Sequence, residues 1–543
     1  MSDKSHDELM SPDGAVTPID TDYQVGQDNI ALKIGPLGLD IHNRVFLVSG
    51  GMIALFVLVT LLFRNSVGPL FNEMRNTLTA QMDWFFIGAG NLFVILCLIL
   101  IFSPLGRVRL GGTEATPDYT YVGWFSMLFA AGMGIGLMFY GVSEPLSHYA
   151  SSFGGVVEAN GVRTDWAPLG GAAGDMAAAK DLGMAATIYH WGLHPWAIYA
   201  LLALSLALFS FNKGLPLTIR SVFYPIFGER IWGWPGHIID ITAVVATLFG
   251  LATSLGFGAS QAAAGLDFLF NIPSGITTQV ILIIGITGLA LMSVVAGLDS
   301  GVKRLSEFNM AMATLLMVFV IVVGPTLSIF TSLGTNMVAY FENLPALSNP
   351  LGREDANYSQ GWTAFYWAWW MSWSPFVGMF IARVSRGRTV REFIICVLLI
   401  PTSVCVLWMT AFGTTAIEQL QDGYRAVVDA DLPLQLFNML DGLPLSSITS
   451  LLGIILVVVF FVTSSDSGSL VIDTISAGGK VDAPVPQRIF WCSFVGLVAI
   501  SLLLGGGLGA LQAMVVSTGL PFCIVLLLCA FSLVKGLMSE PRK

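Results

Sequence analysis

Charge is scarce in this sequence of 543 residues. Asp, Glu, Lys and Arg together make up 11% of the chain, whereas soluble globular proteins carry about 25%. Hydrophobic residues make up 55%, and the mean hydropathy is +0.75. The composition excludes an ordinary soluble domain and indicates a polytopic membrane protein. The net charge of −10 argues against nucleic acid as a partner.

Cysteine and histidine are also scarce, with six of each. The cysteines all lie in apolar runs, which predicts buried free thiols and excludes a disulfide framework. Only His190 and His194 are spaced four residues apart, and a metal site there would lack a third ligand nearby. The first 32 residues are polar and contain no apolar core of a signal peptide, so no cleavable leader is expected.

Long apolar runs are abundant, and a membrane-spanning helix needs about 20 such residues. The sequence predicts an all-α membrane protein with twelve transmembrane helices, and the mixed stretch 333–348 fits an interfacial helix. The predicted spans are 45–63, 85–104, 120–141, 185–211, 235–258, 278–297, 308–332, 362–383, 393–416, 448–465, 488–507 and 512–536.

The distribution of Lys and Arg supports an even number of spans. With the N-terminus inside, 19 of the 25 basic residues lie on the cytoplasmic side, as the positive-inside rule requires. Both termini are therefore predicted to be cytoplasmic, and the same rule explains the basic loop 383–393 without a ligand. The long outer loops are 150–183, 333–360 and 417–447, and no soluble domain of useful size is left over.

Two predicted spans carry matching interruptions. Spans three and eight each begin near a tryptophan and contain a break, at 132–136 and at Ser374-Pro375. Interrupted spans in corresponding positions of two halves point to an inverted-repeat transporter. The predicted division is an acidic tail over 1–34, two extra helices over 35–118, a first repeat over 119–332, an amphipathic connecting segment over 333–360, a second repeat over 361–537 and a short tail over 538–543.

Tryptophan is concentrated in GWTAFYWAWWMSW, residues 361–373. An interfacial belt explains Trp362, but Trp370 and Trp373 would lie roughly 12–17 Å deeper on a helix. Indoles at that depth on one face fit either helix packing or the lining of a binding site. The aromatic residues that share an arc of about 100° are Trp362, Tyr366, Trp369, Trp370 and Trp373.

The stretch YHWGLHPWAIY in span four supplies a second aromatic group. Trp191, Trp196 and Tyr199 fall within about 140° of arc. Pro195 lacks an N–H and should kink the helix. No carboxylate, the usual partner of a primary amine, occurs in these two stretches. A quaternary ammonium is held by the faces of aromatic rings at about 0.5–2 kcal/mol each, so the pattern favours that class of ligand.

Spans three and ten contain small and hydroxyl-bearing residues that allow two interpretations. Alternating glycines over 132–136 fit either close helix packing or an unwound turn that binds a carboxylate and a cation. Thr463 and Ser464 fit either hydrogen bonds to their own helix or a Na⁺ site. Asp466 is expected at the inner end of span ten, either capping the helix or pairing with Arg, and Glu144 is interpreted as structural.

The chain resembles the betaine/choline/carnitine transporter (BCCT) family from about residue 30 to 535. The resemblance is carried by GWTAFYWAWWMSWSPFVGMFIARVSRGRTVREF, AAGMGIGLMFYGVSEPLSHY, YHWGLHPWAIY and FFVTSSDSGS. It implies a five-plus-five inverted-repeat (LeuT-like) core behind two extra N-terminal helices, and a homotrimer in the bacterial inner membrane.

The same resemblance implies the site residues. The aromatic cage would be Trp191, Trp196, Tyr199 and Trp370, and Trp369 and Trp373 would line the path toward the cytoplasm. The substrate carboxylate would meet Met133, Gly134 and Gly136. A Na⁺ site would use carbonyls of Ala130, Met133 and Phe460 and the hydroxyls of Thr463 and Ser464.

Two positions bear on the coupling ion. A second Na⁺ position of the family uses two threonines, but here Leu251 stands four residues after Thr247, which argues against that site. Gly136 stands where proton-coupled choline carriers tend to have Asp, which favours Na⁺ and betaine.

The expected function is Na⁺-coupled symport of glycine betaine or a related onium osmolyte by alternating access. The alternative is proton-coupled or exchange transport of choline, carnitine or dimethylsulfoniopropionate. A channel is disfavoured because no ring-forming charged filter is evident. An enzyme is disfavoured because no cluster of His, Asp or Glu at one depth is evident, and no cofactor is expected.

Overall fold

The structure is a computed structural model that describes residues 12–34, 37–132, 134–296 and 299–542. Helices dominate these ranges, and the strands form two small antiparallel hairpins. The first pairs β1 (Asn29–Ile34) with β2 (Leu37–His42), and the second pairs β3 (Glu158–Ala159) with β4 (Val162–Arg163).

The helices of the N-terminal half run as far as the break at Gly324. They are α2 (Val45–Leu62), α3 (Arg64–Phe102), η1 (Pro104–Arg107), α4 (Tyr121–Gly132), α5 (Ile135–Gly154), α6 (Met176–Trp191), α7 (Leu193–Ala207), η2 (Leu208–Asn212), η3 (Arg220–Phe223), α8 (Tyr224–Phe227), η4 (Gly228–Trp232), α9 (Trp234–Phe270), α10 (Ile276–Ala296) and α11 (Asp299–Val323).

The helices of the C-terminal half include the tryptophan-rich stretch as α14. They are α12 (Thr326–Leu347), α13 (Ala356–Tyr358), η5 (Ser359–Thr363), α14 (Ala364–Arg383), α15 (Val390–Gln421), α16 (Ala426–Asp429), α17 (Leu432–Asp441), α18 (Ser446–Ser476) and α19 (Val485–Met538).

Each of the twelve predicted spans overlaps helix in the structure. By length and composition, nine of the described helical segments can cross a membrane, or ten if the bent pair α4–α5 counts as one span. The indoles of α14 lower its mean hydropathy, and α19 continues across a backbone break at Gly506 and Gly507. The chain is therefore an all-helical, multi-span membrane protein, and the number twelve stays a prediction.

Two predicted boundaries differ from the structure. The predicted span 308–332 is divided, because α11 ends at Val323 and α12 begins at Thr326 after Pro325. Proline has no N–H to continue the helical ladder and restricts the residue before it. The predicted span 448–465 is too short, because α18 continues to Ser476 and carries Asp466 inside the helix.

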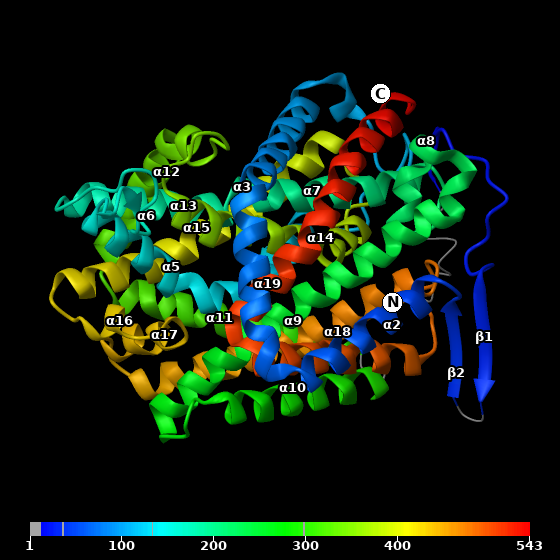
Figure 1. The fold of residues 1–543 in the computed structure, drawn as a ribbon. Helices are drawn as coiled ribbons and strands as arrows, with labels where there is room; N and C mark the ends of the chain where they lie inside the picture. The colour runs from blue at the N-terminus through cyan, green and yellow to red at the C-terminus, as the bar shows by residue number, and fades with distance from the viewer. Residues whose placement is uncertain (1–11, 35–36, 133, 297–298, 543) are drawn as a thin grey trace.

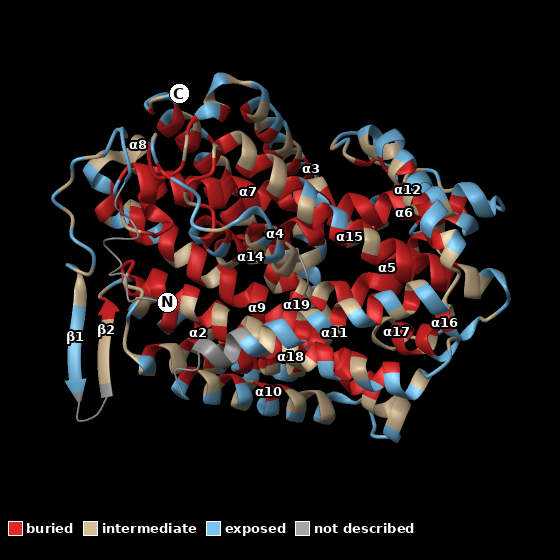
Figure 2. Ribbon diagram, turned by 180° about the vertical axis from the view of Figure 1, so that it is seen from behind, coloured by how far each residue is buried: buried red, intermediate tan, exposed pale blue. Residues whose placement is uncertain are grey.

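The connecting segments gather at two opposite ends of the molecule. In Figure 1, α6, α12, α16 and α17 lie at the left, whereas β1, β2 and α8 lie at the right. The first group belongs to the predicted outer loops and the second to the predicted inner ones, which agrees with the expected alternation. Between them, the buried residues concentrate in α5, α7, α9, α14 and α15, whereas α10 exposes much of its surface (Figure 2).

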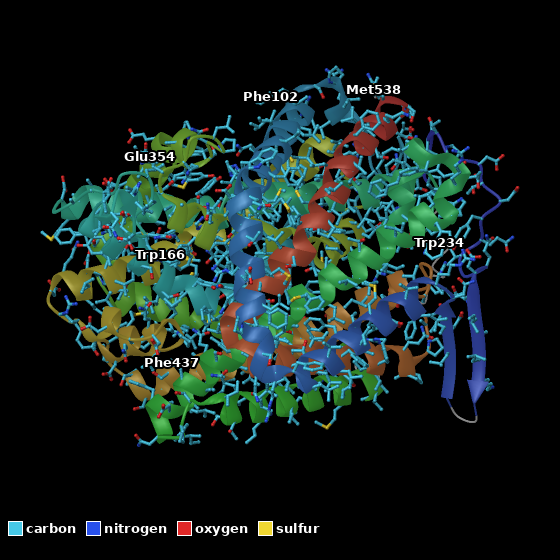
Figure 3. The ribbon with its side chains drawn as sticks, viewed as in Figure 1. Phe102, Trp166, Trp234, Glu354, Phe437 and Met538 are labelled. Carbon is cyan, nitrogen blue, oxygen red and sulfur yellow. The ribbon has the colours of Figure 1, made fainter. Side chains whose placement is uncertain are left out.

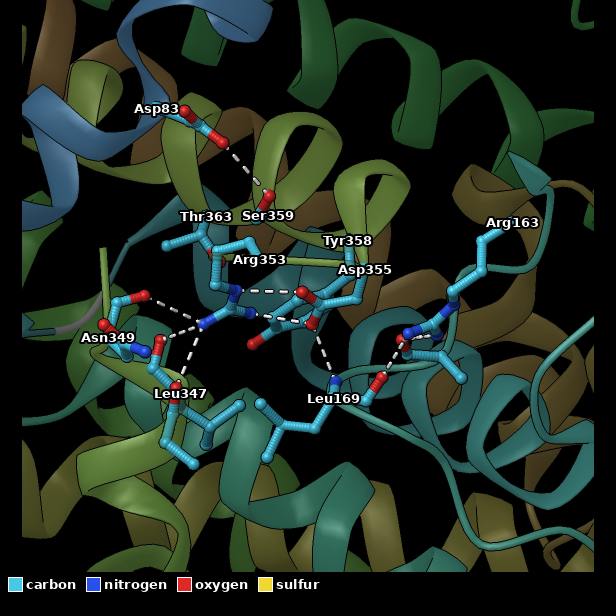
Figure 4. Close-up of polar contacts among 12 residues, drawn as sticks. Asp83, Arg163, Leu169, Leu347, Asn349, Arg353, Asp355, Tyr358, Ser359 and Thr363 are labelled. Atoms are coloured by element: carbon cyan, nitrogen blue, oxygen red, sulfur yellow. Dashed lines mark hydrogen bonds and ion pairs between the residues drawn. The ribbon is translucent and has the colours of Figure 1, made fainter. Parts of the chain in front are cut away.

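A polar network fixes the chain that leads into α14 (Figure 4). Arg353 donates two hydrogen bonds to Asp355 at 2.8 and 2.7 Å, and the same carboxylate accepts from the backbone N–H of Leu169 at 2.7 Å. Ser359 donates to Asp83 of α3 at 3.3 Å. These bonds join three segments of the outer end, and so they anchor the start of α14.

Candidate functional site

The backbone is interrupted at two of the places where the sequence predicts a break or a kink, residues 132–136 and the region of Pro195. The third place, Ser374-Pro375, lies inside α14, which is helical throughout Ala364–Arg383, so the break predicted there is wrong. The first helical segment α4 ends at Gly132, and Gly134 is extended, with φ −170° and ψ −177°, before α5 begins at Ile135. The helix pair α6–α7 breaks at Gly192, where the chain leaves helical geometry three residues before Pro195. Both breaks therefore expose backbone groups inside the helical bundle.

A cavity of about 290 Å³ lies where these interruptions meet α11, α14 and α18. The structure brings together in it every predicted site residue that it describes, whereas Met133 lies outside the described residues. The predicted residues that line the cavity are Ala130, Gly134, Gly136, Trp191, Trp196, Tyr199, Trp369, Trp370, Trp373, Phe460, Thr463 and Ser464.

Four aromatic side chains of the cavity contact one another edge to face. The ring centroids of Trp191 and Trp370 are 4.9 Å apart, with their planes at 71°, and those of Trp196 and Tyr199 are 5.2 Å apart at 73°. Tyr199 and Trp370 join the two pairs at 6.4 Å. All four rings line the same cavity, and a group of aromatic side chains around one volume is the kind of lining that binds a quaternary ammonium group.

Tryptophans 369 and 373 lie beside this cluster on the same helix. Trp369 stacks on Trp370 at 4.9 Å, and Trp373 contacts the edge of Phe376 at 5.3 Å. Both indoles line the cavity. Three of the five aromatic residues predicted to share one face of this helix therefore line the cavity. Trp370 and Trp373, which the sequence placed too deep for an interfacial belt, are two of the three.

Gly136 makes room for the cage. A Cβ atom there would lie 2.7 Å from the ring of Trp191. Any side chain at position 136 would displace the Trp191 indole. An Asp at this position is therefore incompatible with the observed place of Trp191.

The oxygen-rich side of the cavity combines α4 and α18. The Thr463 hydroxyl donates to the carbonyls of Val459 and Phe460, both at 3.1 Å, as expected for a hydroxyl that bonds to its own helix. Ser464 and Ala130 line the cavity as well. Elsewhere, Leu251 packs closely against Gly468, so an apolar side chain occupies the position at which a second Na⁺ site would need a hydroxyl.

Asn309 of α11 was not identified from the sequence. It lines the cavity and is 1% exposed, and within the described ranges neither its amide nitrogen nor its amide oxygen has a hydrogen-bond partner. Buried polar groups are normally paired, so this amide is available to a ligand or to water. Asn309 lies in the predicted span 308–332, and polar residues within spans are often functional. Its presence there could have identified it from the sequence.

Glu144 of α5 is the second residue whose position the sequence did not reveal. Its carboxylate is fully buried and accepts hydrogen bonds from Trp191 Nε1 at 2.6 Å and from the Tyr366 hydroxyl at 2.5 Å. His190 Nδ1 lies 2.6 Å and His148 Nε2 3.3 Å from the same carboxylate. Glu144 therefore fixes the Trp191 ring from outside the cavity.

Asp466 pairs with Arg488 at 2.9 Å, which is one of the two roles that the sequence indicated for it.

The cavity carries no formal charge from the described residues that line it. It offers aromatic faces, a serine and threonine edge, backbone groups near Gly134 and the amide of Asn309. This combination suits a neutral or zwitterionic solute with a cationic group that has no N–H to donate.

The comparisons with known proteins agree with this chemistry. The model of the betaine/carnitine/choline family transporters matches residues 44–542. The chain is a member of this family. Family members are transporters, so the predictions of the family and of a non-enzymatic role are confirmed.

Among the relatives, the chain is similar to two proteins of Vibrio parahaemolyticus. It is 71% identical to a glycine betaine/proline/choline transporter over 100% of this chain and 98% of the relative. It is 52% identical to glycine betaine transporter 1 over 96% of this chain and 97% of the relative. A glycine betaine transporter of Acinetobacter baylyi is 42% identical over 93% of this chain and 74% of the relative.

Proposed function

We propose that the protein is a secondary active transporter that couples Na⁺ entry to the uptake of glycine betaine or a related quaternary ammonium osmolyte. The observation that carries the proposal is the aromatic cage of Trp191, Trp196, Tyr199 and Trp370 in an uncharged cavity inside a multi-span membrane protein. The cage would hold the trimethylammonium group, and the backbone near Gly134 with the Asn309 amide would meet the carboxylate.

Na⁺ would bind between the broken helix α4–α5 and α18. Hard oxygen ligands suit a small cation, and Ala130, Phe460, Thr463 and Ser464 line this side of the cavity. Transport would proceed by alternating access of the two inverted repeats around the fixed site. We further propose a homotrimer in the bacterial inner membrane with both termini cytoplasmic, bounded by membrane lipids.

A second candidate is supported by the internal bonding of Thr463. Its hydroxyl already bonds to Val459 and Phe460 and so does not require a Na⁺ ion as a partner. A protein with the same fold would then transport its substrate without Na⁺. It would then act as a proton-coupled or exchange transporter of choline, carnitine or dimethylsulfoniopropionate.

The test is uptake of radiolabelled glycine betaine into proteoliposomes under an inward Na⁺ or K⁺ gradient. Uptake that requires Na⁺ would support symport, and unlabelled choline, proline and ectoine would then rank the solutes that the cage accepts. Uptake that is indifferent to Na⁺ but follows a pH gradient or internal substrate would favour the second candidate.

A double variant tests the ion site. Thr463→Ala with Ser464→Ala should raise the Na⁺ concentration needed for half-maximal uptake. Thr242→Ala is the matched control, because its side chain is also half-buried and its hydroxyl also bonds within its own helix, to Ile238. An unchanged Na⁺ dependence in the double variant would refute the site.

A further inference from the structure

A second, strongly basic pocket lies away from the aromatic cavity. It has a volume of about 200 Å³ and is lined by Arg107, Arg109 and Arg391, together with Thr113, Thr389, Gly106 and Pro541. The three arginines come from two segments far apart in the sequence. The positive-inside rule explains why this end of the chain is basic, but it does not explain why three guanidinium groups line one pocket.

Backbone pairing builds this pocket. Residues 108–110 run antiparallel to 387–390, with Val390 N–H donating to Val108 O at 2.8 Å and Leu110 N–H to Arg388 O at 2.9 Å. The pairing places Arg109 beside Thr389, the N-cap residue of α15. The first turn of this 32-residue helix therefore lies at the pocket, where the helix dipole favours an anion.

No carboxylate of the described residues forms an ion pair with these three arginines. Arg109 donates to the carbonyls of Gly387 and Ala115, and Arg391 donates to those of Ile101 and Ser103. Across the described part of the chain, Arg107 has no hydrogen bond or ion pair, and none of the three forms a salt bridge. Each guanidinium has five N–H donors, so most of these donors remain available.

Two acidic side chains that adjoin pocket-lining residues in the sequence have other partners. Glu392 pairs with Arg388 at 2.8 Å and caps the start of α15. Glu540 pairs with Lys213 at 2.5 Å, and it also accepts from Asn212. Three arginines that have no carboxylate partner among the described residues therefore line one pocket, and such a cluster attracts an anion.

We propose that this pocket binds a phosphate group, held by Arg107, Arg109 and Arg391 with the hydroxyls of Thr113 and Thr389. Arginine forks match the geometry of phosphate oxygens, and such charge-assisted hydrogen bonds are the strong ones. The phosphate comes either from an anionic phospholipid or from a free phosphate compound.

The position favours the lipid source. The pocket follows directly after α3, whose last residue, Phe102, is 82% exposed, as is expected of a helix that faces lipid. Figure 3 labels Phe102 and Met538 near each other at the upper edge of the molecule, at the ends of α3 and α19. A phosphate that enters here could therefore remain attached to acyl chains beside α3.

The experiment measures binding of the full-length protein rather than transport. Native mass spectrometry would count retained phosphatidylglycerol and phosphatidylcholine, and the thermal midpoint would be followed with inorganic phosphate against chloride at equal ionic strength. Arg107→Gln is the test variant because its exposed side chain has no partner among the residues that the structure describes. Arg230→Gln is the matched control, an exposed arginine in η4 that loses the same charge.

We expect Arg107→Gln to weaken phosphatidylglycerol retention about tenfold, while Arg230→Gln and phosphatidylcholine retention stay unchanged. Stabilisation by inorganic phosphate that Arg107→Gln abolishes, without selective retention of phosphatidylglycerol, would assign the pocket to a free phosphate compound. Equal effects of the two substitutions, or no effect of either probe, would overturn the proposal. Neither result depends on which solute or ion the protein transports.

Discussion

Trp370 is the ring that joins the two halves of the cage. It contacts Trp191 and Tyr199, and its Nε1–H donates to the carbonyl of His190 at 2.9 Å. That bond restrains the orientation of the indole, which lines the cavity. Trp370 therefore contacts one member of each aromatic pair.

Replacing Trp370 by Leu should weaken betaine binding while the protein still folds. A lost cation–π contact costs about 0.5–2 kcal/mol, which is roughly a 2- to 30-fold rise in Kd. Isothermal titration or scintillation proximity binding would measure it. Trp84→Leu is the control, because Trp84 is 50% exposed on α3 and does not line the cavity. Normal binding by Trp370→Leu would contradict the cage assignment.

Replacing Glu144 tests whether the buried carboxylate positions the cage. In Glu144→Gln, the amide NH₂ cannot accept, so a buried donor of Trp191, Tyr366 or a histidine is left unpaired at about 1–3 kcal/mol. Betaine affinity should fall although Glu144 does not line the cavity.

The readout is the change in tryptophan fluorescence on betaine addition, together with the binding constant. Glu158→Gln, an exposed residue of β3, is the control. If the Glu144 variant bound betaine as the unmodified protein does, the carboxylate would have no part in positioning the cage.

At the scale of single elements, the β1–β2 hairpin responds to pH through His42. Burial, and then the nearby Arg220, His237 and Arg44, lower the pKa of His42 to about 3, against about 6.5 in an unfolded chain. Its Nδ1 accepts from the backbone N–H groups of Arg44 and Val45, both at 3.3 Å. The neutral imidazole is therefore the form that the fold stabilises.

Because the folded pKa is depressed, the unfolded state binds the proton more readily as pH falls below about 6.5. The attachment of β1–β2 should be fully stable above that pH and weaken steadily toward pH 4. Hydrogen–deuterium exchange of residues 29–42, corrected for intrinsic rates, would follow it. His42→Asn should lose this dependence, and a flat profile in the unmodified protein would contradict the assignment.

At the scale of the whole molecule, the two groups of connecting segments should be reachable from opposite sides of the membrane. Glu158→Cys, in β3, should react with an impermeant maleimide in intact cells. Asp482→Cys, between α18 and α19, should react only after permeabilisation. Five of the six native cysteines are buried and Cys396 is partly buried, so the background should be low. The same labelling pattern at both positions would refute the predicted topology.

Composition and periodicity predicted the all-helical membrane class, and the motifs predicted which residues share the cavity. Those signals are local: a glycine alternation, a proline or a tryptophan face marks its own helix. The contact between Glu144 and Trp191 joins α5 to α6, and the amide of Asn309 comes from α11. Such contacts depend on how helices cross, and no spacing within one helix encodes that.

Boundaries were predicted less well, for a related reason. The division at Pro325 replaced one expected span by parts of two helices, and α18 runs past the polar stretch at 463–467. Hydropathy marks where a segment can lie in lipid, but a helix whose polar side chains find protein partners can continue. Asp466 does so through Arg488 and Ser293.

The carboxylate behind the cage also has an electronic consequence. An indole N–H or a phenol O–H that donates to an anion shifts electron density into its ring and makes the ring face more negative. Trp191 and Tyr366 both donate to Glu144, and Trp191 faces the cavity. A cation bound in the proposed cage would therefore meet a better π-donor than an isolated indole. Glu144, which lies outside the contact surface, would then strengthen binding of that cation without the desolvation cost of a direct ion pair.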